Sequence, residues 1–110
     1  MNQVFTDITL QQNIKINGLC YNTNFRCFTS NTNTIPLRSQ LDKVFCALFN
    51  KKNQVITREE LIERVWDGNH FTGAKALTHS ICKLRKIFVE LGDEKTRIIT
   101  IPKYGYCLKI

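Results

Sequence analysis

Four cations stand between residues 72 and 89 of this 110-residue chain with no carboxylate among them, namely Lys75, Lys83, Arg85 and Lys86. Ammonium and guanidinium groups bind phosphate, so this segment has the chemistry of a surface that holds a polyanion. At 100° per residue, one helical face would carry Lys75, His79, Cys82 and Lys86, flanked by Thr78, Lys83 and Arg85. Taken alone, such a face is more often plain solvated surface.

The opposite face of the same segment is apolar. Its members recur at i, i+4, i+7, i+11 and i+14, the spacing of one buried stripe: Leu77, Ile81, Leu84, Phe88 and Leu91. A helix with one apolar and one cationic face fits a polyanionic groove, such as the major groove of DNA. A membrane-surface helix is the main competitor, but it would keep its apolar face exposed, whereas this face is expected to join a core.

Charge along the chain supports the nucleic-acid interpretation. The chain has 16 Lys and Arg against 9 Asp and Glu, a net charge of +7. Residues 1–71 hold 8 basic and 6 acidic side chains, a net charge of +2, while residues 72–110 hold 8 and 3, a net charge of +5. A basic half in a small domain is typical of nucleic-acid binding.

Other classes of protein find little support. No apolar run approaches the roughly 18 residues of a membrane span, and the start of the chain lacks a signal peptide, so we expect a cytoplasmic protein. The five cysteines include no CxxC pair, and neither histidine is spaced with a cysteine pair, so no metal site or cofactor is expected. Motifs of hydrolases, metalloproteases and phosphate loops are missing, which predicts that the chain is not an enzyme.

The elements that must position the basic segment follow from periodicity. Residues 1–37 alternate with period two, in pairs such as Ile8/Leu10, Ile14/Ile16 and Phe25/Cys27, and predict three or four short antiparallel strands with a tight turn at Asn17-Gly18. Residues 38–50 predict a first helix. Thr57 and Glu60 form a capping-box pattern at the start of a second helix, which would bury Leu61, Ile62, Val65 and Trp66.

The remaining connections complete the predicted order. Residues 53–56 are expected to form a short extended link, and residues 67–73 a loop with Thr72 as N-cap of the basic helix. Gly92 would end that helix. Residues 98–101 and 106–110 predict a hairpin around Pro102, Lys103, Tyr104 and Gly105.

This order predicts one α+β domain spanning residues 1–110. It has the layout of a winged helix-turn-helix, with an N-terminal antiparallel strand platform (about 1–37), a core of three helices (about 38–91) and a C-terminal β-hairpin wing (about 97–110). In such a fold the third helix enters the major groove, and the hairpin reaches the adjacent backbone or minor groove.

Three segments resemble the C-terminal effector domains of the OmpR/PhoB type, over roughly residues 37–110: VITREELIERVW, ALTHSICKLRKIF and IITIPKYGYCL. The Trp-Asp-Gly after the second helix and the Ile-Pro-Lys-Tyr-Gly-Tyr wing resemble its ToxR/CadC-like branch. The resemblance implies a bacterial transcription regulator, usually an activator, that binds tandem half-sites on double-stranded DNA as a dimer. It also implies that Trp66 and Tyr106 are structural.

Position by position, the resemblance implies DNA contacts on the helix and the wing: Lys75, His79, Ser80, Lys83, Arg85, Thr100, Lys103 and Tyr104. Ser80 would contact a phosphate. The residue types of the helix add Lys86 as a phosphate contact and Thr78 as a base contact, and Arg85, its only guanidinium, would read a guanine. The loop that touches RNA polymerase in some members corresponds to Asp67, Gly68, Asn69, His70 and Phe71. Departures from the family's pattern include Pro102 and Cys82 where arginine is common, so we expect a weak electrostatic contribution and A·T-rich sites.

Two matters stay open at this point. A winged-helix interaction module with weak or no DNA binding is the alternative function, motivated by the few cations and by aromatic residues at Phe71 and Tyr104. With about 37 residues before the first helix, no receiver domain is expected within this chain. The segment itself is not expected to contact a membrane, although ToxR/CadC-like regulators continue into a membrane span, which would place the domain at the cytoplasmic face of the inner membrane.

Overall fold

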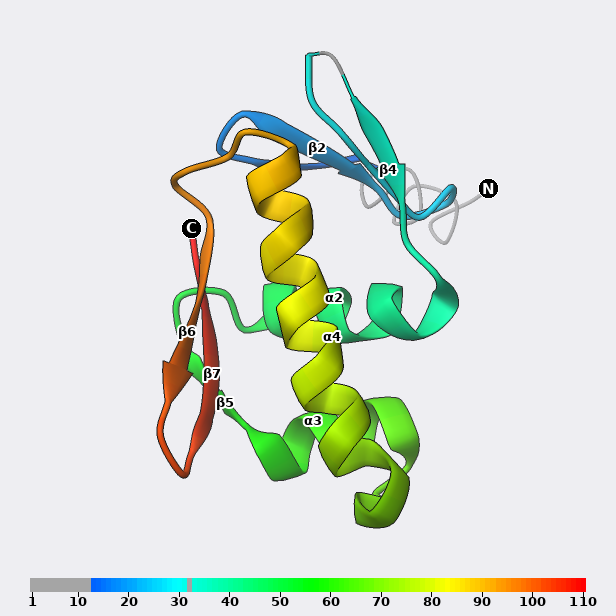
Figure 1. The fold of residues 1–110 in the computed structure, drawn as a ribbon, viewed down its shortest axis with the longest axis vertical. Helices are drawn as coiled ribbons and strands as arrows, with labels where there is room; N and C mark the ends of the chain where they lie inside the picture. Colours follow the sequence, from blue (N-terminus) through cyan, green and yellow to red (C-terminus); the bar gives the residue numbers. More distant parts are fainter. Residues whose placement is uncertain (1–12, 32) are drawn as a thin grey trace, which may run out of the picture.

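The computed structural model of the protein describes residues 13–31 and 33–110, and within them it shows two antiparallel sheets and three helices. The predicted α+β winged helix-turn-helix is confirmed. In Figure 1 the longest helix, α4 (His70–Glu90), runs the length of the molecule, with a four-stranded sheet at one end and a three-stranded sheet along its side. The predicted strand pair at Ile8/Leu10 lies outside the described residues.

The N-terminal platform is a meander of β1 (Asn13–Ile16), β2 (Leu19–Asn22), β3 (Cys27–Thr29) and β4 (Thr34–Pro36) in the order β1-β2-β3-β4. Asn17 has a φ of 54°, and Ile16 pairs with Leu19, so the predicted two-residue turn at Asn17-Gly18 is confirmed. The Phe25/Cys27 pair was a wrong prediction, because Phe25 lies in the β2–β3 turn and is 79 % exposed.

Aromatic rings join this platform to the helices. Tyr21 and Phe28 pair across β2 and β3 with ring centroids 4.6 Å apart, and each lies within 5 Å of the ring of Phe45 in α2 (Ser39–Asn50). Phe28 also meets Phe88 of α4 edge to face at 5.6 Å. Such pairs contribute roughly 0.5–1.5 kcal/mol each beyond burial of their area, so the platform is part of the core.

A polar cluster lies beside these rings. The Tyr21 hydroxyl and the Cys46 thiol both donate hydrogen bonds to Oδ1 of Asp42. Burial, together with the nearby Asp42, raises the pKa of Cys46 to about 12. Cys46 therefore stays a protonated thiol at neutral pH, and we assign it a structural role.

Helix α4 begins earlier than predicted. Its N-cap is Asn69, whose Oδ1 accepts a hydrogen bond from the Thr72 amide at 3.2 Å, so Thr72 lies inside the helix and was the wrong cap. Asparagine is the stronger N-cap of the two, which explains the difference. At the other end Gly92 has a φ of +74°, so the predicted stop at Gly92 is confirmed.

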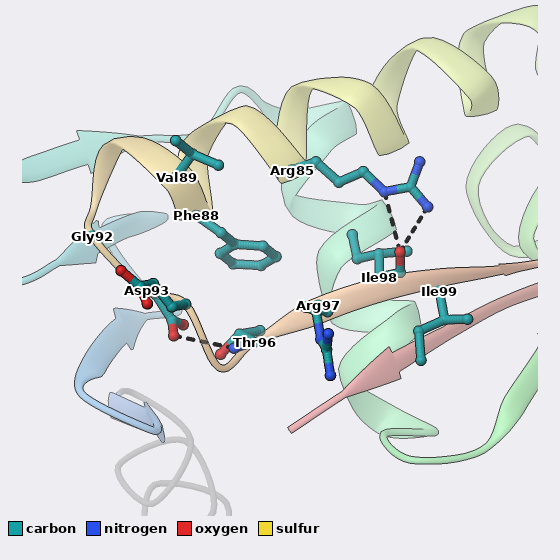
Figure 2. Close-up of a pocket in the computed structure, with 10 residues that line it drawn as sticks. Arg85, Phe88, Val89, Gly92, Asp93, Thr96, Arg97, Ile98 and Ile99 are labelled. Atoms are coloured by element: carbon teal, nitrogen blue, oxygen red, sulfur yellow. Dashed lines mark hydrogen bonds between the residues drawn. The ribbon is translucent and has the colours of Figure 1, made fainter.

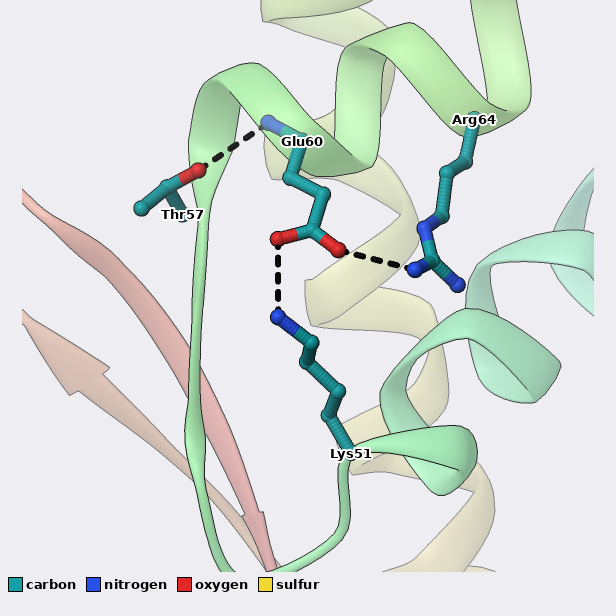
Figure 3. A network of polar contacts seen from close by, with 4 residues as sticks. All are labelled: Lys51, Thr57, Glu60 and Arg64. Carbon is teal, nitrogen blue, oxygen red and sulfur yellow. Dashed lines mark hydrogen bonds and ion pairs between the residues drawn. The ribbon is translucent and has the colours of Figure 1, made fainter.

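Only half of the predicted capping box forms at α3 (Arg58–Trp66). Thr57 Oγ1 accepts from the Glu60 amide at 3.1 Å, but the Glu60 carboxylate turns to Lys51 at 3.0 Å and Arg64 at 2.9 Å (Figure 3). Two cations hold the carboxylate more strongly than one backbone N–H would. The side chain of Glu60 therefore fastens α3 to the end of α2.

This ion pair predicts a pH effect on stability. The hydrogen bond from Lys51 is the main cause that lowers the pKa of Glu60. A depressed carboxyl pKa stabilises the fold above its unfolded value, about 4.3, and this contribution is lost as the pH falls through the folded pKa. We expect Glu60→Gln to lower the melting temperature at pH 7, with a difference from wild type that shrinks below about pH 4. A difference independent of pH in melting curves would contradict the charge-based role, and Glu59→Gln, at an exposed position one residue away, is the control.

The wing has three strands instead of two. Residues expected to form only a link contain β5 (Val55–Thr57), which pairs with β7 (Gly105–Lys109), and β7 pairs in turn with β6 (Arg97–Ile101). Ile56 is buried on this sheet. The hairpin thus continues the sheet of β5, which fixes its base against the helices.

None of the helices in the described part of the chain is both long enough and apolar enough to cross a membrane.

Candidate nucleic-acid interface

The outward face of α4 carries the predicted cations. Five of the predicted contact residues are exposed on it: Lys75, Thr78, His79, Lys83 and Lys86. The inward face is buried, with Leu77, Ile81 and Leu84 at no more than 1 % exposure. The predicted division of this helix into a core stripe and a cationic face is therefore confirmed, although contact with DNA stays a prediction.

The wing lies beside this helix, as Figure 1 shows. Its tip is the turn Pro102-Lys103-Tyr104, closed by a hydrogen bond from the Tyr104 amide to the Ile101 carbonyl at 2.9 Å. Lys103 adopts a φ of 67°, and Tyr104 is 64 % exposed. Thr100, Lys103 and Tyr104 are all exposed, so a cation and an aromatic ring stand at the free end of the hairpin.

Ser80 does not belong to this surface. It is 5 % exposed and lies on the inward side of α4 beside Ile81. A phosphate cannot reach a side chain buried between a helix and its core. The phosphate contact predicted for Ser80 is therefore wrong, because the matching by position took no account of which face the residue occupies.

Arg85 is exposed but its guanidinium already has partners. Nε and Nη2 donate to the carbonyl oxygen of Ile98 in β6, at 3.1 and 2.6 Å, and Nη2 also donates to Thr100 Oγ1 at 2.9 Å. Figure 2 shows the side chain reaching from α4 to the strand. Bidentate contact with guanine needs a pair of N–H groups aimed at its O6 and N7. The reading role predicted for Arg85 is corrected, because the guanidinium points to β6 instead.

Arg58 is a residue that sequence reasoning missed. Its Nη1 donates to the Tyr106 hydroxyl at 2.9 Å and to Thr78 Oγ1 at 3.4 Å, and its Nη2 donates to the Ala74 carbonyl at 3.0 Å. It thereby joins the start of α3, the first half of α4 and β7. A signal was present, because a cation in the first turn of a helix opposes the helix dipole and so indicates a partner elsewhere.

The predicted partner loop is shorter than expected. Only Asp67, Gly68 and Asn69 separate α3 from α4, and Asp67 and Gly68 both have positive φ angles, 52° and 78°. His70 and Phe71 belong to the first turn of α4, where both are exposed, Phe71 by 97 %. A tight contact fixes this corner, since a Cβ on Gly73 would lie 2.9 Å from Cγ2 of Ile62 in α3.

Trp66, at the end of α3, packs against the core but is only half-buried. Val65 is also half-buried, whereas Leu61 and Ile62 are fully buried as predicted.

Among the described residues no group of three metal-binding side chains comes together.

Comparison with known proteins adds independent findings. The family described as "Transcriptional regulatory protein, C terminal" matches residues 32–108. The cholera toxin homolog transcriptional activator of Vibrio parahaemolyticus is 32 % identical over 80 residues, which cover 72 % of this chain and 27 % of the relative. The response regulator protein GraR of Staphylococcus epidermidis is 39 % identical over 59 residues, which cover 54 % of this chain and 26 % of the relative. The chain thus spans about a quarter of these relatives' length.

Two solved structures share the fold. The DNA-binding domain of Escherichia coli CadC aligns with a TM-score of 0.74 at 28 % identity and covers 89 % of this chain and 92 % of that one. The Klebsiella pneumoniae RstA DNA-binding domain, solved in complex with the RstA box, aligns with a TM-score of 0.71 at 20 % identity and covers 89 % of this chain and 97 % of that one. The second likeness concerns the fold alone.

Proposed function

Because the chain belongs to the family of C-terminal domains of transcriptional regulatory proteins, we propose that it binds double-stranded DNA sequence-selectively as the DNA-binding domain of a bacterial transcription regulator. The observation that carries this proposal is the outward face of α4, where Lys75, Lys83 and Lys86 stand with no carboxylate between residues 72 and 89. The exposed wing beside it ends in Lys103. Helix α4 would enter the major groove and the wing the adjacent minor groove or backbone.

The residues of α4 limit how bases can be read. The helix contains no Asn or Gln, and its one guanidinium is bonded to β6. Lysine contacts with guanine and Thr78 or His79 contacts with thymine remain for direct readout. Because few side chains can contact the bases directly, we expect selectivity to depend mainly on the shape of the groove. Lys103 at the wing tip suits a narrow, A·T-rich minor groove. We therefore propose A·T-rich sites, arranged in tandem for two copies of the domain.

The short corner between α3 and α4 is the proposed contact for RNA polymerase, which would make the regulator an activator. Asp67, Gly68, Asn69 and His70 directly precede Phe71 in the chain, and Phe71 is 97 % exposed. An exposed aromatic ring is typical of a residue that anchors a protein contact. The domain would act in the cytoplasm, where bacterial DNA lies, or at the cytoplasmic face of the inner membrane in a tethered regulator.

A salt titration tests DNA binding. With Lys75, Lys83, Lys86, Lys103 and helix N-terminal amides as contacts, about four to six phosphates are neutralised per domain, so log K against log salt should have a slope near −4 to −5. Fluorescence anisotropy with a labelled A·T-rich duplex of about 30 base pairs, between about 50 and 300 mM salt, gives the slope. No binding at the lowest salt would favour the alternative, a protein-interaction module.

One lysine should account for about one unit of that slope. Lys83→Ala removes a phosphate contact, so it should weaken binding to all sequences similarly and flatten the slope by about one unit. Lys15→Ala, at an exposed lysine of β1 in the platform, is the matched control and should leave the slope unchanged. An unaltered slope for Lys83→Ala would remove this residue from the contacts.

A further inference from the structure

Two guanidinium groups connect α4 to the wing at separate points. Arg58 bonds the first half of the helix, at Ala74 and Thr78, and also bonds Tyr106 of β7. Its guanidinium carbon lies 6.0 Å from the centre of the Tyr106 ring. About two turns further along α4 from Thr78, Arg85 bonds Ile98 and Thr100 of β6. Together the two arginines span the face on which helix and sheet meet.

Near Arg85 the helix and the strand share only part of the core. Phe88 of α4 and Ile98 of β6 are buried there, but an open cavity of about 600 Å³ lies beside them and is bordered by the exposed side chains of Val89 and Ile99 (Figure 2). Side chains that border such a space lose dispersion contacts on that side. Beside this open space the three hydrogen bonds of Arg85 therefore add to the packing of Ile98 in holding β6 against α4.

Neutral oxygens are the partners of both arginines. The ion pairs found in residues 13–31 and 33–110 both involve Glu60, and neither Arg58 nor Arg85 is paired with a carboxylate there. Carbonyl and hydroxyl groups satisfy the donors without cancelling the charge. Each guanidinium therefore fixes geometry and still adds its full positive charge to the surface around it.

We infer that Arg58 and Arg85 are positioning residues, which hold the wing at a set distance and angle from α4 so that both can contact one duplex at once. This inference rests on the proposed DNA binding. Two linked contacts bind more tightly than either alone only if their geometry allows both together. Holding that geometry in the free protein removes the cost of ordering the wing on binding.

A double-mutant cycle between Lys103 at the wing tip and Arg85 on α4 tests this role. Arg85→Met keeps an unbranched apolar stem beside the cavity but removes the donors, and Lys103→Ala removes the cation of the wing tip. In the wild-type background we expect Lys103→Ala to weaken DNA binding roughly five- to tenfold. In the Arg85→Met background it should cost less than about twofold, because a loosened wing no longer reaches its contact. Lys83→Ala on α4 is the control and should cost the same in both backgrounds.

Two results would overturn the inference. One is an equal cost for Lys103→Ala in both backgrounds, and the other is a changed base preference at a single pair in Arg85→Met, which would make Arg85 a direct reader. Thr100→Val is a near-isosteric change that deletes one acceptor of Arg85. In this background Lys103→Ala should have a cost for DNA binding between those in the other two backgrounds. Thr100→Val replaces Arg85→Met in the cycle if Arg85→Met does not fold. The same cycle with Arg58→Met in place of Arg85→Met tests the positioning role of Arg58.

Hydrogen exchange in the free protein separates this inference from the proposed function. In Arg85→Met, amides of the β6–β7 hairpin should exchange at least about tenfold faster while those of α2 and α3 stay unchanged. Unchanged hairpin exchange would refute the positioning role even if the domain binds DNA. Faster exchange in a protein that does not bind DNA would refute the proposed function and leave Arg85 as the fastening of the wing.

Discussion

Gly105→Ala is expected to destabilise the domain strongly. A Cβ on Gly105 would lie 2.0 Å from the carbonyl oxygen of Ile56 and 2.8 Å from the Cα of Thr57. Both atoms belong to the backbone of β5, so no side-chain rotation relieves the clash, and β5 must move away from β7. Overpacking of this kind costs about 1–3 kcal/mol and occasionally more, and here it also breaks the pairing of Thr57 with Gly105 at the start of α3.

Urea unfolding measures this loss. Against a total stability of about 5–15 kcal/mol for a small domain, we expect Gly105→Ala to lower the free energy of unfolding by about 3 kcal/mol or more. Gly18→Ala is the control, because a Cβ on Gly18 would meet nothing within 4 Å. An unfolding curve for Gly105→Ala that overlays the wild-type curve would show that β5 does not approach β7 as described.

Reversing two charges on α4 should abolish DNA binding at physiological salt. Lys83→Glu with Lys86→Glu removes two phosphate contacts and places two carboxylates where phosphates would lie, so repulsion is added to the lost counterion release. We expect the affinity for an A·T-rich duplex to fall by about 100-fold or more at roughly 0.1 M salt, with little change in melting temperature because both side chains are exposed.

Lys15→Glu with Lys109→Glu is the matched control. Lys15 is exposed in β1, and Lys109 is exposed at the last residue of β7, at the opposite end of that strand from the wing tip. The net charge of the control equals that of the test variant. We expect it to lose much less affinity, through the general field alone. Equal losses in the two variants would mean that binding depends on net charge and not on the face of α4.

The sequence predicted what local periodicity and capping chemistry determine. The stripe of Leu77, Ile81, Leu84 and Phe88 is buried because a helix repeats every 3.6 residues, whatever packs against it. Asn17-Gly18 forms a turn because Asn17 tolerates the positive φ that the turn requires. Gly92 ends α4 for the same reason.

What escaped prediction depends on partners distant in sequence. Val55 and Ile56 looked like a link because only β7, about 50 residues later, makes them a strand. Arg85 looked like a reading residue because its spacing places it on the exposed face, while its partners Ile98 and Thr100 come from the wing. Ser80 was matched to a phosphate contact by position, but its side chain is buried and cannot make that contact. In each case the sequence gives the type of the side chain but does not show which distant residues surround it.

The central claim is that α4 and the wing form one surface for double-stranded DNA, and an NMR titration of the ¹⁵N-labelled domain with an A·T-rich duplex tests it most directly. We predict amide shift changes concentrated at Lys75, His79, Lys83 and Lys86 and at the wing tip around Lys103, with the platform strands β1 and β2 unaffected. The absence of shift changes at low salt, or shift changes confined to the platform, would contradict the claim.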